Sequence, residues 1–198
     1  MPLRLSFYGD PILRKKGAEI VRVDDAIRVF AREMIETMHA HRGVGLAAQQ
    51  VGRALMLCVV DVRNVERPSQ LFVGGCEVPV ESLMPIVLIN PRLQEAPESE
   101  EGVEGCLSFP GLAAPVPRSP STQVSALGLE GRPLALMATG FLARAIQHEV
   151  DHLNGVLFID RMTPEARKPL EPDILRLERA TKAELKKSRR RSAKPAPH

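Results

Sequence analysis

The chain has 198 residues, of which 44% are hydrophobic, an ordinary share for one globular domain with a tail. No apolar run reaches the roughly 18 residues that a membrane-spanning helix needs, and the first residues form no signal-peptide core, so we expect a cytoplasmic protein that binds no membrane. The three cysteines, Cys58, Cys76 and Cys106, argue against a disulfide framework because they are few and odd in number.

The net charge of +3 is concentrated at the C-terminal end. Residues 182–198 hold seven Lys and Arg and one Glu, which leaves 20 basic and 23 acidic residues in the other 181. The body of the chain is therefore mildly acidic and its end is basic. With no Trp and one Tyr, the sequence contains no aromatic-rich nucleic-acid motif, so we expect no specific DNA binding.

Residues 23–43 predict the first helix, because apolar residues recur there along one face. This stripe consists of Ile27, Phe30, Met34, Ile35 and Met38. Asp24 or Asp25 suits the N-cap position. His39 and His41 lie near the end of the helix, and we interpret them as ordinary helix-end or surface residues.

Several segments predict strands. Residues 54–62 and 84–90 are compact apolar runs rich in Val, Leu and Ile, which are typical of buried strands. Between them, residues 63–84 contain Pro and paired Gly and predict an irregular excursion or a hairpin. Residues 123–129 and 132–138 flank a Glu-Gly pair and predict a second hairpin.

The remaining elements are mainly helical. A helix is predicted from about residue 140 to Asn154-Gly155, a pair that suits a helix end. Residues 156–160 predict a short strand, and residues 173–187 predict a last helix. The predicted order along the chain is strands, an amphipathic helix, more strands and a helix. This order favours an α+β fold over regular βαβ alternation.

His148, Glu149 and His152 form a His-Glu-x-x-His motif. Residues four apart lie on the same face of a helix, so the two imidazoles can bind one metal ion. Glu149 is offset by about 100° from His148, which favours a proton-transferring base over a third ligand. The alternative is a chance spacing of two surface histidines.

The third ligand is less evident. Peptidases with this motif take a later His or Glu, but the helix ends at once and Asp160 lies in the next predicted strand. Residues 101–112, upstream, place Cys106 beside a glycine and before Ser-Phe-Pro, so a thiolate can approach the ion. A Cys-His-His set with an open position is typical of catalytic metal sites. Spacing alone leaves the assignment of Cys106 open.

A third notable segment, residues 42–52, has the sequence RGVGLAAQQVG. Its glycines and alanines allow close approach of the backbone, and Gln50 provides an amide that can donate a hydrogen bond. The Gly-Lys-Ser/Thr ending of a phosphate loop is missing. A tight helix-to-strand connection is the structural alternative.

Together these segments resemble the peptide deformylases. GVGLAAQQ (43–50), EGCLS (104–108) and QHEVDHLNG (147–155) match the three signatures of that family in order. GDPILR (9–14) is similar to the usual beginning of the family, and VPR (116–118) to the segment after the cysteine motif. Three ordered motifs are far more specific than one His-Glu-x-x-His.

The resemblance covers roughly residues 3–163. It implies an α+β fold with mixed or antiparallel β-sheets around a central metal-binding helix, plus an N-terminal and a C-terminal helix. We expect a catalytic domain over residues 1–170 and a C-terminal helix with a basic tail over residues 171–198. Residues 63–84 look longer than the connection in compact members of the family.

The resemblance implies a metal-dependent hydrolase that removes the formyl group from N-formylmethionyl nascent peptides and releases formate. Cys106, His148 and His152 would hold one divalent ion, Fe²⁺ in many members, although the ligands would also suit Zn²⁺, Ni²⁺ or Co²⁺. The ion would lower the pKa of a water molecule whose proton Glu149 takes.

The resemblance also implies how the intermediate is stabilised and where the substrate lies. The side-chain amide of Gln50 and the backbone N–H of Leu107 would donate to the oxyanion. The helix face of the two histidines continues backwards to apolar residues beside the predicted ion. The expected substrate-binding residues are Val44, Gly45, Gly105, Phe141 and Ala145.

Rival functions lack support in the sequence. An internal-bond metallopeptidase needs a later third ligand, and a structural metal site usually has four Cys or His ligands. The basic segment 182–194 suits the RNA-rich surface of a ribosome, with a solvated tail as the alternative. The sequence does not determine the metal, the peptide preference beyond formylmethionine or the oligomeric state.

Overall fold

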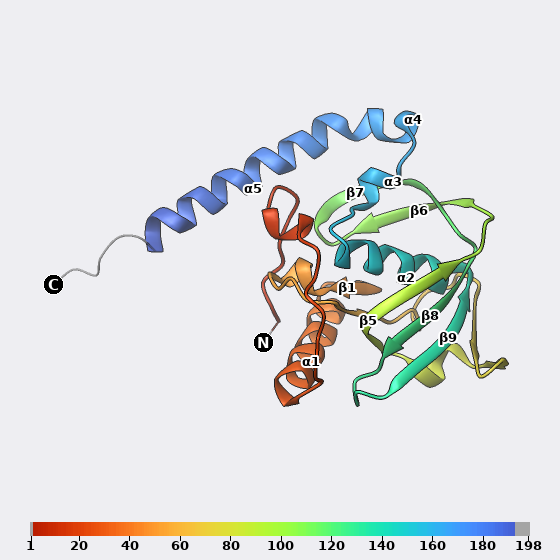
Figure 1. The fold of residues 1–198 in the computed structure, drawn as a ribbon. Helices are drawn as coiled ribbons and strands as arrows, with labels where there is room; N and C mark the ends of the chain where they lie inside the picture. Colours follow the sequence, from red (N-terminus) through yellow and green to blue (C-terminus); the bar gives the residue numbers. More distant parts are fainter. Residues whose placement is uncertain (1, 193–198) are drawn as a thin grey trace.

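The computed structural model describes residues 2–192 and shows two antiparallel sheets around one buried helix (Figure 1). A seven-stranded sheet has the order β1-β2-β5-β8-β9-β3-β4, and β6 pairs with β7 in a separate hairpin. The strands are β1 (Gly45–Ala47), β2 (Leu57–Val60), β3 (Ser69–Val73), β4 (Cys76–Val78), β5 (Ile86–Glu95), β6 (Glu100–Cys106), β7 (Phe109–Arg118), β8 (Ser121–Leu127) and β9 (Pro133–Thr139).

The first α-helix precedes all the strands and the other described α-helices follow them, so the α+β class is confirmed. The helices are α1 (Asp25–Ala40), α2 (Gly140–Leu153), α3 (Phe158–Arg161), α4 (Pro164–Arg167) and α5 (Glu171–Ser192), with 3₁₀ turns η1 (Pro11–Arg14), η2 (Ala48–Val51), η3 (Val80–Leu83) and η4 (Lys168–Leu170). Within residues 2–192, no helix has the length and apolarity needed to cross a membrane.

Helix α1 follows its sequence pattern. Asp24 is the N-cap, and its carboxylate accepts a hydrogen bond from the Ile27 N–H at 3.0 Å. Phe30, Met34 and Met38 are fully buried in one core cluster with residues of β1, β2 and β5. The apolar stripe therefore packs α1 against the edge of the main sheet that β1 forms.

Helix α2 is central, and every residue from 142 to 153 is buried. Its first residue, Gly140, has φ +62°, and a Cβ there would lie 2.3 Å from the carbonyl oxygen of Pro68. That carbonyl accepts a hydrogen bond from the Phe141 N–H at 2.9 Å, and the Ser69 hydroxyl accepts one from the Leu142 N–H at 3.1 Å. Pro68 and Ser69, at the start of β3, thus satisfy two of the free N–H donors at the start of α2.

The segment 63–84 contains the hairpin β3–β4, and β3 also pairs with β9, so the excursion extends the main sheet. The predicted hairpin of residues 123–129 and 132–138 is confirmed by the β8–β9 pairing. The β6–β7 hairpin was not predicted, because its Gly, Glu and Pro residues weaken the strand signal.

The predicted strand over residues 156–160 is wrong, because Phe158–Arg161 forms the short helix α3. The Asp160 carboxylate accepts a hydrogen bond from the Leu157 N–H at 2.8 Å and so closes the first turn. Phe158 and Ile159 are both buried on the same side of the chain, in a cluster with Phe109. An apolar run of five residues did not distinguish these two conformations.

Helix α5 is longer at both ends than the predicted 173–187. Ile174 is buried against the cluster around Phe109 and Phe158, which fixes the first part of the helix. Farther along, Glu184 forms an ion pair with Arg4 at 2.9 Å. The C-terminal part then projects from the body of the molecule (Figure 1). Residues 193–198, the end of the predicted basic tail, lie outside the described residues.

Candidate metal centre and its cavity

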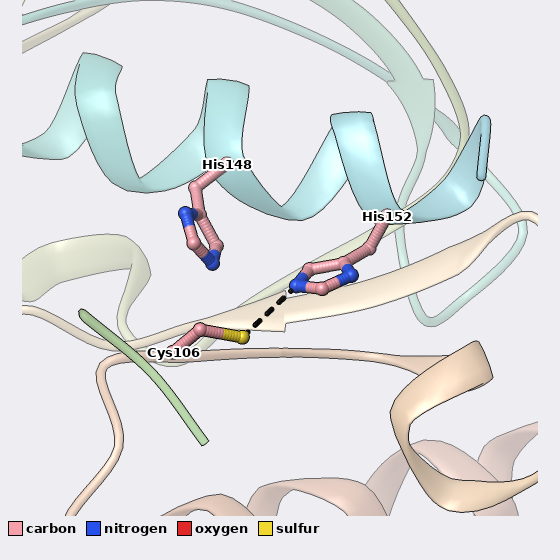
Figure 2. Close-up of side chains that lie close together, drawn as sticks. All are labelled: Cys106, His148 and His152. Carbon is pink, nitrogen blue, oxygen red and sulfur yellow. Dashed lines mark hydrogen bonds between the residues drawn. The ribbon is translucent and has the colours of Figure 1, made fainter. Parts of the chain in front are cut away.

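Three potential metal ligands meet at the end of β6. Helix α2 presents His148 and His152 one turn apart, and both rings point toward Cys106 (Figure 2). One ligand atom from each residue lies within 4.8 Å of the other two. The Sγ atom of Cys106 is 3.2 Å from Nε2 of His152. The structure therefore brings together the three residues that the sequence suggested as ligands.

An irregularity in the β6–β7 hairpin positions Cys106. The register shifts between Gly105 and Cys106, and Cys106 then faces Phe109 across a tight connection. Phe109 is fully buried, stacks on Tyr8 with ring centroids 4.8 Å apart and meets Phe158 edge-on at 5.0 Å. These aromatic contacts anchor the connection, so the thiol is held beside α2.

A buried carboxylate orients His148. Oε2 of Glu104 lies 2.9 Å from Nδ1 of His148, which leaves Nε2 for a metal ion. Arg118 donates two hydrogen bonds to the same carboxylate at 2.9 and 3.1 Å, and Arg144 donates one at 3.0 Å. Burial opposes ionisation of Glu104, but the bonds from His148 and Arg118 outweigh it and lower the pKa to about 2.

Arg118 connects this carboxylate to a second one. It forms an ion pair with Asp151, whose other oxygen accepts a hydrogen bond from Arg161 at 2.7 Å. Asp151 lies on α2 between the two histidines, one residue before His152. The wall behind the imidazoles is therefore a connected set of charged groups that fixes α2 against β6 and β7.

Gln50 presents an amide N–H₂ group to the cluster. The residue is buried in η2, and its Oε1 accepts a hydrogen bond from the Ala47 N–H at 2.8 Å. Because the oxygen is engaged in this way, Nε2 faces Cys106 Sγ at 3.4 Å and Ser108 Oγ at 3.3 Å. The side chain is thus oriented as a donor toward the space beside the thiol.

Glu149 lies beside the two histidines with one free oxygen. The residue is only 4% exposed, and its Oε2 has no hydrogen-bond partner among the described residues. Burial raises its pKa to about 7, so the carboxyl group can gain and lose a proton near neutral pH. A Cβ at Gly45 would lie 2.2 Å from Oε1, so any larger residue there would displace the carboxylate.

These groups fit a divalent transition metal. One soft thiolate and two imidazoles form a three-ligand set, with a cavity on the open side, as catalytic sites require. Nδ1 of His152 is buried without a partner among the described residues. His39 and His41 do not join the cluster: His39 contacts Asp61 at 2.9 Å, as its place near the helix end suggested.

A cavity of about 800 Å³ opens beside the cluster, within the range of small-molecule and peptide sites. Cys106, His148, Glu149, Gln50 and Leu107 all border it. So do the five residues expected to bind substrate: Val44, Gly45, Gly105, Phe141 and Ala145. Of the predicted site residues, only His152 does not border this cavity; it joins the cluster through Cys106.

Sequence reasoning missed the roles of Glu104, Arg118 and Asp151, although all three lie in quoted motifs. A usable signal existed for Glu104, because residues two apart in a strand share a face and Glu104 is two residues before Cys106. Arg144 lies four residues before His148 on α2. It is buried and donates to the carbonyl oxygens of Glu100, Gly102 and Val116 at 2.8, 3.3 and 2.7 Å.

Comparison with known proteins gives one consistent result. The family model for polypeptide deformylase matches residues 2–168. The peptide deformylase of Methylacidiphilum infernorum is 48% identical over 90% of this chain and 94% of its own. That of Opitutus terrae is 44% identical over 94% and 98%.

Solved structures show the same similarity. A peptide deformylase from Synechococcus elongatus, solved with actinonin, has a TM-score of 0.73 and 41% identity, and the match covers 86% of this chain and 85% of the other. The peptide deformylase from Thermus thermophilus has a TM-score of 0.75 and 33% identity, with 90% and 99% covered.

Proposed function

Because this chain belongs to the peptide deformylase family, metal-dependent hydrolases that remove the N-formyl group from nascent peptides, we propose that Cys106, His148 and His152 hold its metal ion. The observation that carries this assignment is the meeting of the three ligand atoms within 4.8 Å, next to the unpartnered carboxylate oxygen of Glu149. The substrate of the reaction is the formyl amide of an N-formylmethionyl peptide.

The bound metal is Fe²⁺ in this proposal. The thiolate and two imidazoles suit a first-row divalent ion, and Zn²⁺, Ni²⁺ or Co²⁺ would fit the same ligands. When bound, the ion supplies Lewis-acid chemistry that makes water acidic and polarises the formyl carbonyl. The contact with Glu104 would keep the proton of His148 on Nδ1 and so leave Nε2 to bind the ion.

Glu149 moves the proton. Its Oε2 accepts a proton from the attacking water, and its pKa of about 7 suits this exchange near neutral pH. The oxygen of the water bonds to the formyl carbon, the carbon–nitrogen bond breaks, and Glu149 returns the proton to the departing amine. Nε2 of Gln50 and the backbone N–H of Leu107 donate to the oxygen that carries the negative charge between these steps.

The rest of the cavity binds the peptide. Val44, Phe141 and Ala145 provide apolar walls for the methionine side chain, whose burial contributes roughly 1.5–3 kcal/mol. Gly45 lies in β1, the edge strand of the main sheet, and Gly105 lies in β6. An extended peptide can pair with these edges through its backbone, which leaves its side chains free to vary.

The assignment of Glu149 is tested by the Glu149→Ala variant. Metal content and formate release from formyl-Met-Ala-Ser are measured on the same sample. We expect the metal to stay bound and turnover to be lost, since Glu149 is not among the three ligand residues. Loss of the metal together with activity would contradict the role of proton carrier. Gln50→Ala should lower turnover by about 10²–10³-fold without loss of metal.

The ligand assignment is tested by comparing cysteines. Cys106→Ser replaces a soft thiolate by a hydroxyl, so we expect loss of the metal or a change in metal preference. Cys58 is fully buried in the core and Cys76 is exposed in β4, so Cys58→Ala and Cys76→Ser are the controls that should keep the metal. Full metal retention in Cys106→Ser with an unchanged metal preference would refute the assignment.

We also propose that the enzyme works in the cytoplasm and finds nascent chains through the basic end of α5. Truncation after Leu185 removes the last basic residues of the chain but keeps the contact between Arg4 and Glu184. It should weaken co-sedimentation with ribosomes at low salt and leave tripeptide turnover nearly unchanged. Equal co-sedimentation of the two proteins would indicate that the basic end is only a solvated tail.

A further inference from the structure

Two exposed arginines border the cavity beside the metal centre. Arg42 lies between α1 and β1, and Arg67 lies in the excursion just before β3. Neither forms an ion pair with a carboxylate among residues 2–192. An arginine without a carboxylate partner beside a binding cavity can donate to an anionic group of the ligand.

Arg67 is held in place by its neighbours. The Pro68 carbonyl and the Ser69 hydroxyl bind the first N–H groups of α2, so the backbone next to Arg67 is fixed to the helix that carries the histidines. The guanidinium carbon lies 4.5 Å from the centre of the Phe141 ring, and both side chains border the cavity. This stacking covers one face of the guanidinium and leaves its N–H edge available.

Arg42 reaches the same cavity from the other chain segment. Its backbone is left-handed, with φ +55°. The N–H of the next residue, Gly43, donates a hydrogen bond to the carbonyl oxygen of Met38 at 2.9 Å. This turn ends α1 and leads directly into β1, the edge strand proposed to pair with the peptide. Arg42 therefore lies where the residues after formylmethionine would pass.

The other charged groups at the cavity do not neutralise these arginines. Glu104 is buried and shared by His148, Arg118 and Arg144. Glu149 is buried beside the metal ligands, and the ring of His41 contacts the Thr37 carbonyl oxygen at 2.9 Å. The outer part of the cavity thus has a positive charge with no exposed carboxylate among its lining residues.

We propose that Arg42 and Arg67 make this deformylase prefer formylated peptides with acidic side chains at the second and third positions. The preference rests on the proposed use of the cavity as the peptide site. The cavity is large enough to hold more than one side chain, and the methionine pocket occupies only the part near Phe141 and Ala145. A carboxylate on a following residue would then meet the free N–H edges of the arginines.

The test compares three amidated peptides, formyl-Met-Asp-Asp-Ala, formyl-Met-Asn-Asn-Ala and formyl-Met-Lys-Lys-Ala. Amidation removes the terminal carboxylate, which would otherwise supply an anion of its own. We expect kcat/KM to be about two- to fivefold higher for the Asp peptide than for the Asn peptide, and lower still for the Lys peptide. The Asp preference should shrink in about 0.5 M salt, roughly three times the physiological ionic strength of about 0.15 M.

Variants separate charge from structure. Arg42→Gln/Arg67→Gln should abolish the Asp-to-Asn preference, and Arg42→Glu/Arg67→Glu should reverse it in favour of Lys. Arg53→Gln is the matched control, because Arg53 stacks on Phe30 at 4.4 Å and does not border the cavity. The Arg53→Gln variant should therefore show the same Asp-to-Asn preference as the unchanged protein.

The outcomes distinguish the two proposals. Turnover of the Asn peptide without any Asp preference would overturn the role of the arginines and leave the proposed function intact. An Asp preference that persists in the Arg42→Gln/Arg67→Gln variant would also overturn the role of the arginines. Absence of formate from all three peptides with the metal-loaded protein would overturn the proposed function, and the preference with it.

Discussion

The arginines near the metal centre form two groups that differ in burial. Arg118 and Arg144 are 5% and 3% exposed, and both donate to Glu104 behind His148. Arg42 and Arg67 are exposed at the outer part of the cavity and pair with no carboxylate of the described chain. The same side chain therefore fixes the site in one region and remains available to a ligand in the other.

Solvation explains the difference. A buried charge without a partner is very unfavourable. Arg118 and Arg144, which form the inner wall of the site behind His148, are therefore bonded to carboxylates and carbonyl oxygens. At the cavity mouth, water solvates each guanidinium and weakens any single ion pair to about 0–1 kcal/mol. The inner wall should consequently affect stability and metal binding, whereas the outer arginines should affect mainly the choice of peptide.

The largest expected effect is on the inner wall. Arg118→Ala leaves Glu104 and Asp151 without their common partner in a buried position. We expect the free energy of unfolding to fall by about 3–5 kcal/mol, measured by urea denaturation of the metal-free protein. Arg161→Ala is the control, since Arg161 bonds to the same Asp151 but is half exposed, and its effect should be much smaller. Equal losses of unfolding free energy in the two variants would contradict the distinction between buried and exposed arginines.

The metal centre and its inner wall also show which residues the sequence could predict. His148, Glu149 and His152 were predicted from helical spacing alone, because a regular helix fixes which side chains share a face. Cys106 required the resemblance to a family, since its approach depends on an irregular hairpin connection. The carboxylate partners of Arg118 lie 14 and 33 positions before and after it in the chain, and local patterns contain no such information.

The error at residues 156–160 has a similar origin. The run Val-Leu-Phe-Ile-Asp is apolar enough for a strand, but Asp160 closes a helical turn and pairs with Arg14 from the beginning of the chain. No pattern in the sequence singles out Arg67, because the excursion that contains it has no recognisable motif. Its position became evident only from the docking of residues 68 and 69 on α2.

A second prediction concerns metal affinity. Glu104→Gln keeps the size of the side chain but removes the charge that holds Nδ1–H of His148. We expect affinity for the metal to fall by about 10–100-fold, measured by competition with a chelator. Glu101→Gln on the same strand is the control, because Glu101 is exposed and does not border the cavity. Unchanged affinity in Glu104→Gln would mean that His148 is positioned by packing alone.

A third prediction uses a site of intermediate burial. The Asp61 side chain is 4% exposed, but its partners Arg63 and His39 are 41% and 45% exposed. The hydrogen bond from Arg63 is the main cause that lowers the pKa of Asp61 from 3.8 to about 2. Because the folded pKa is below the unfolded value, the stabilisation is present above about pH 4 and is lost as pH falls through 2.

Asp61→Asn should therefore lower the free energy of unfolding by about 1 kcal/mol at pH 6, with a smaller difference at pH 3. Urea denaturation of the two proteins at pH 6, 4 and 3 measures the convergence. A difference that stays constant over this range would show that the charge of Asp61 is not the source of the stabilisation.

The smallest expected effect is at the cavity mouth. Arg67→Gln removes a guanidinium that touches the face of Phe141 and has no carboxylate partner in the described chain. An exposed contact of this kind contributes about 0.5–1 kcal/mol. We expect the free energy of unfolding to change by less than about 1 kcal/mol, measured in urea beside Arg118→Ala. A loss comparable with that variant would place Arg67 among the residues that hold α2 in position, because its neighbours Pro68 and Ser69 bind the first N–H groups of the helix. A small change in stability combined with a changed peptide preference would instead separate the two groups of arginines by function as well as by burial.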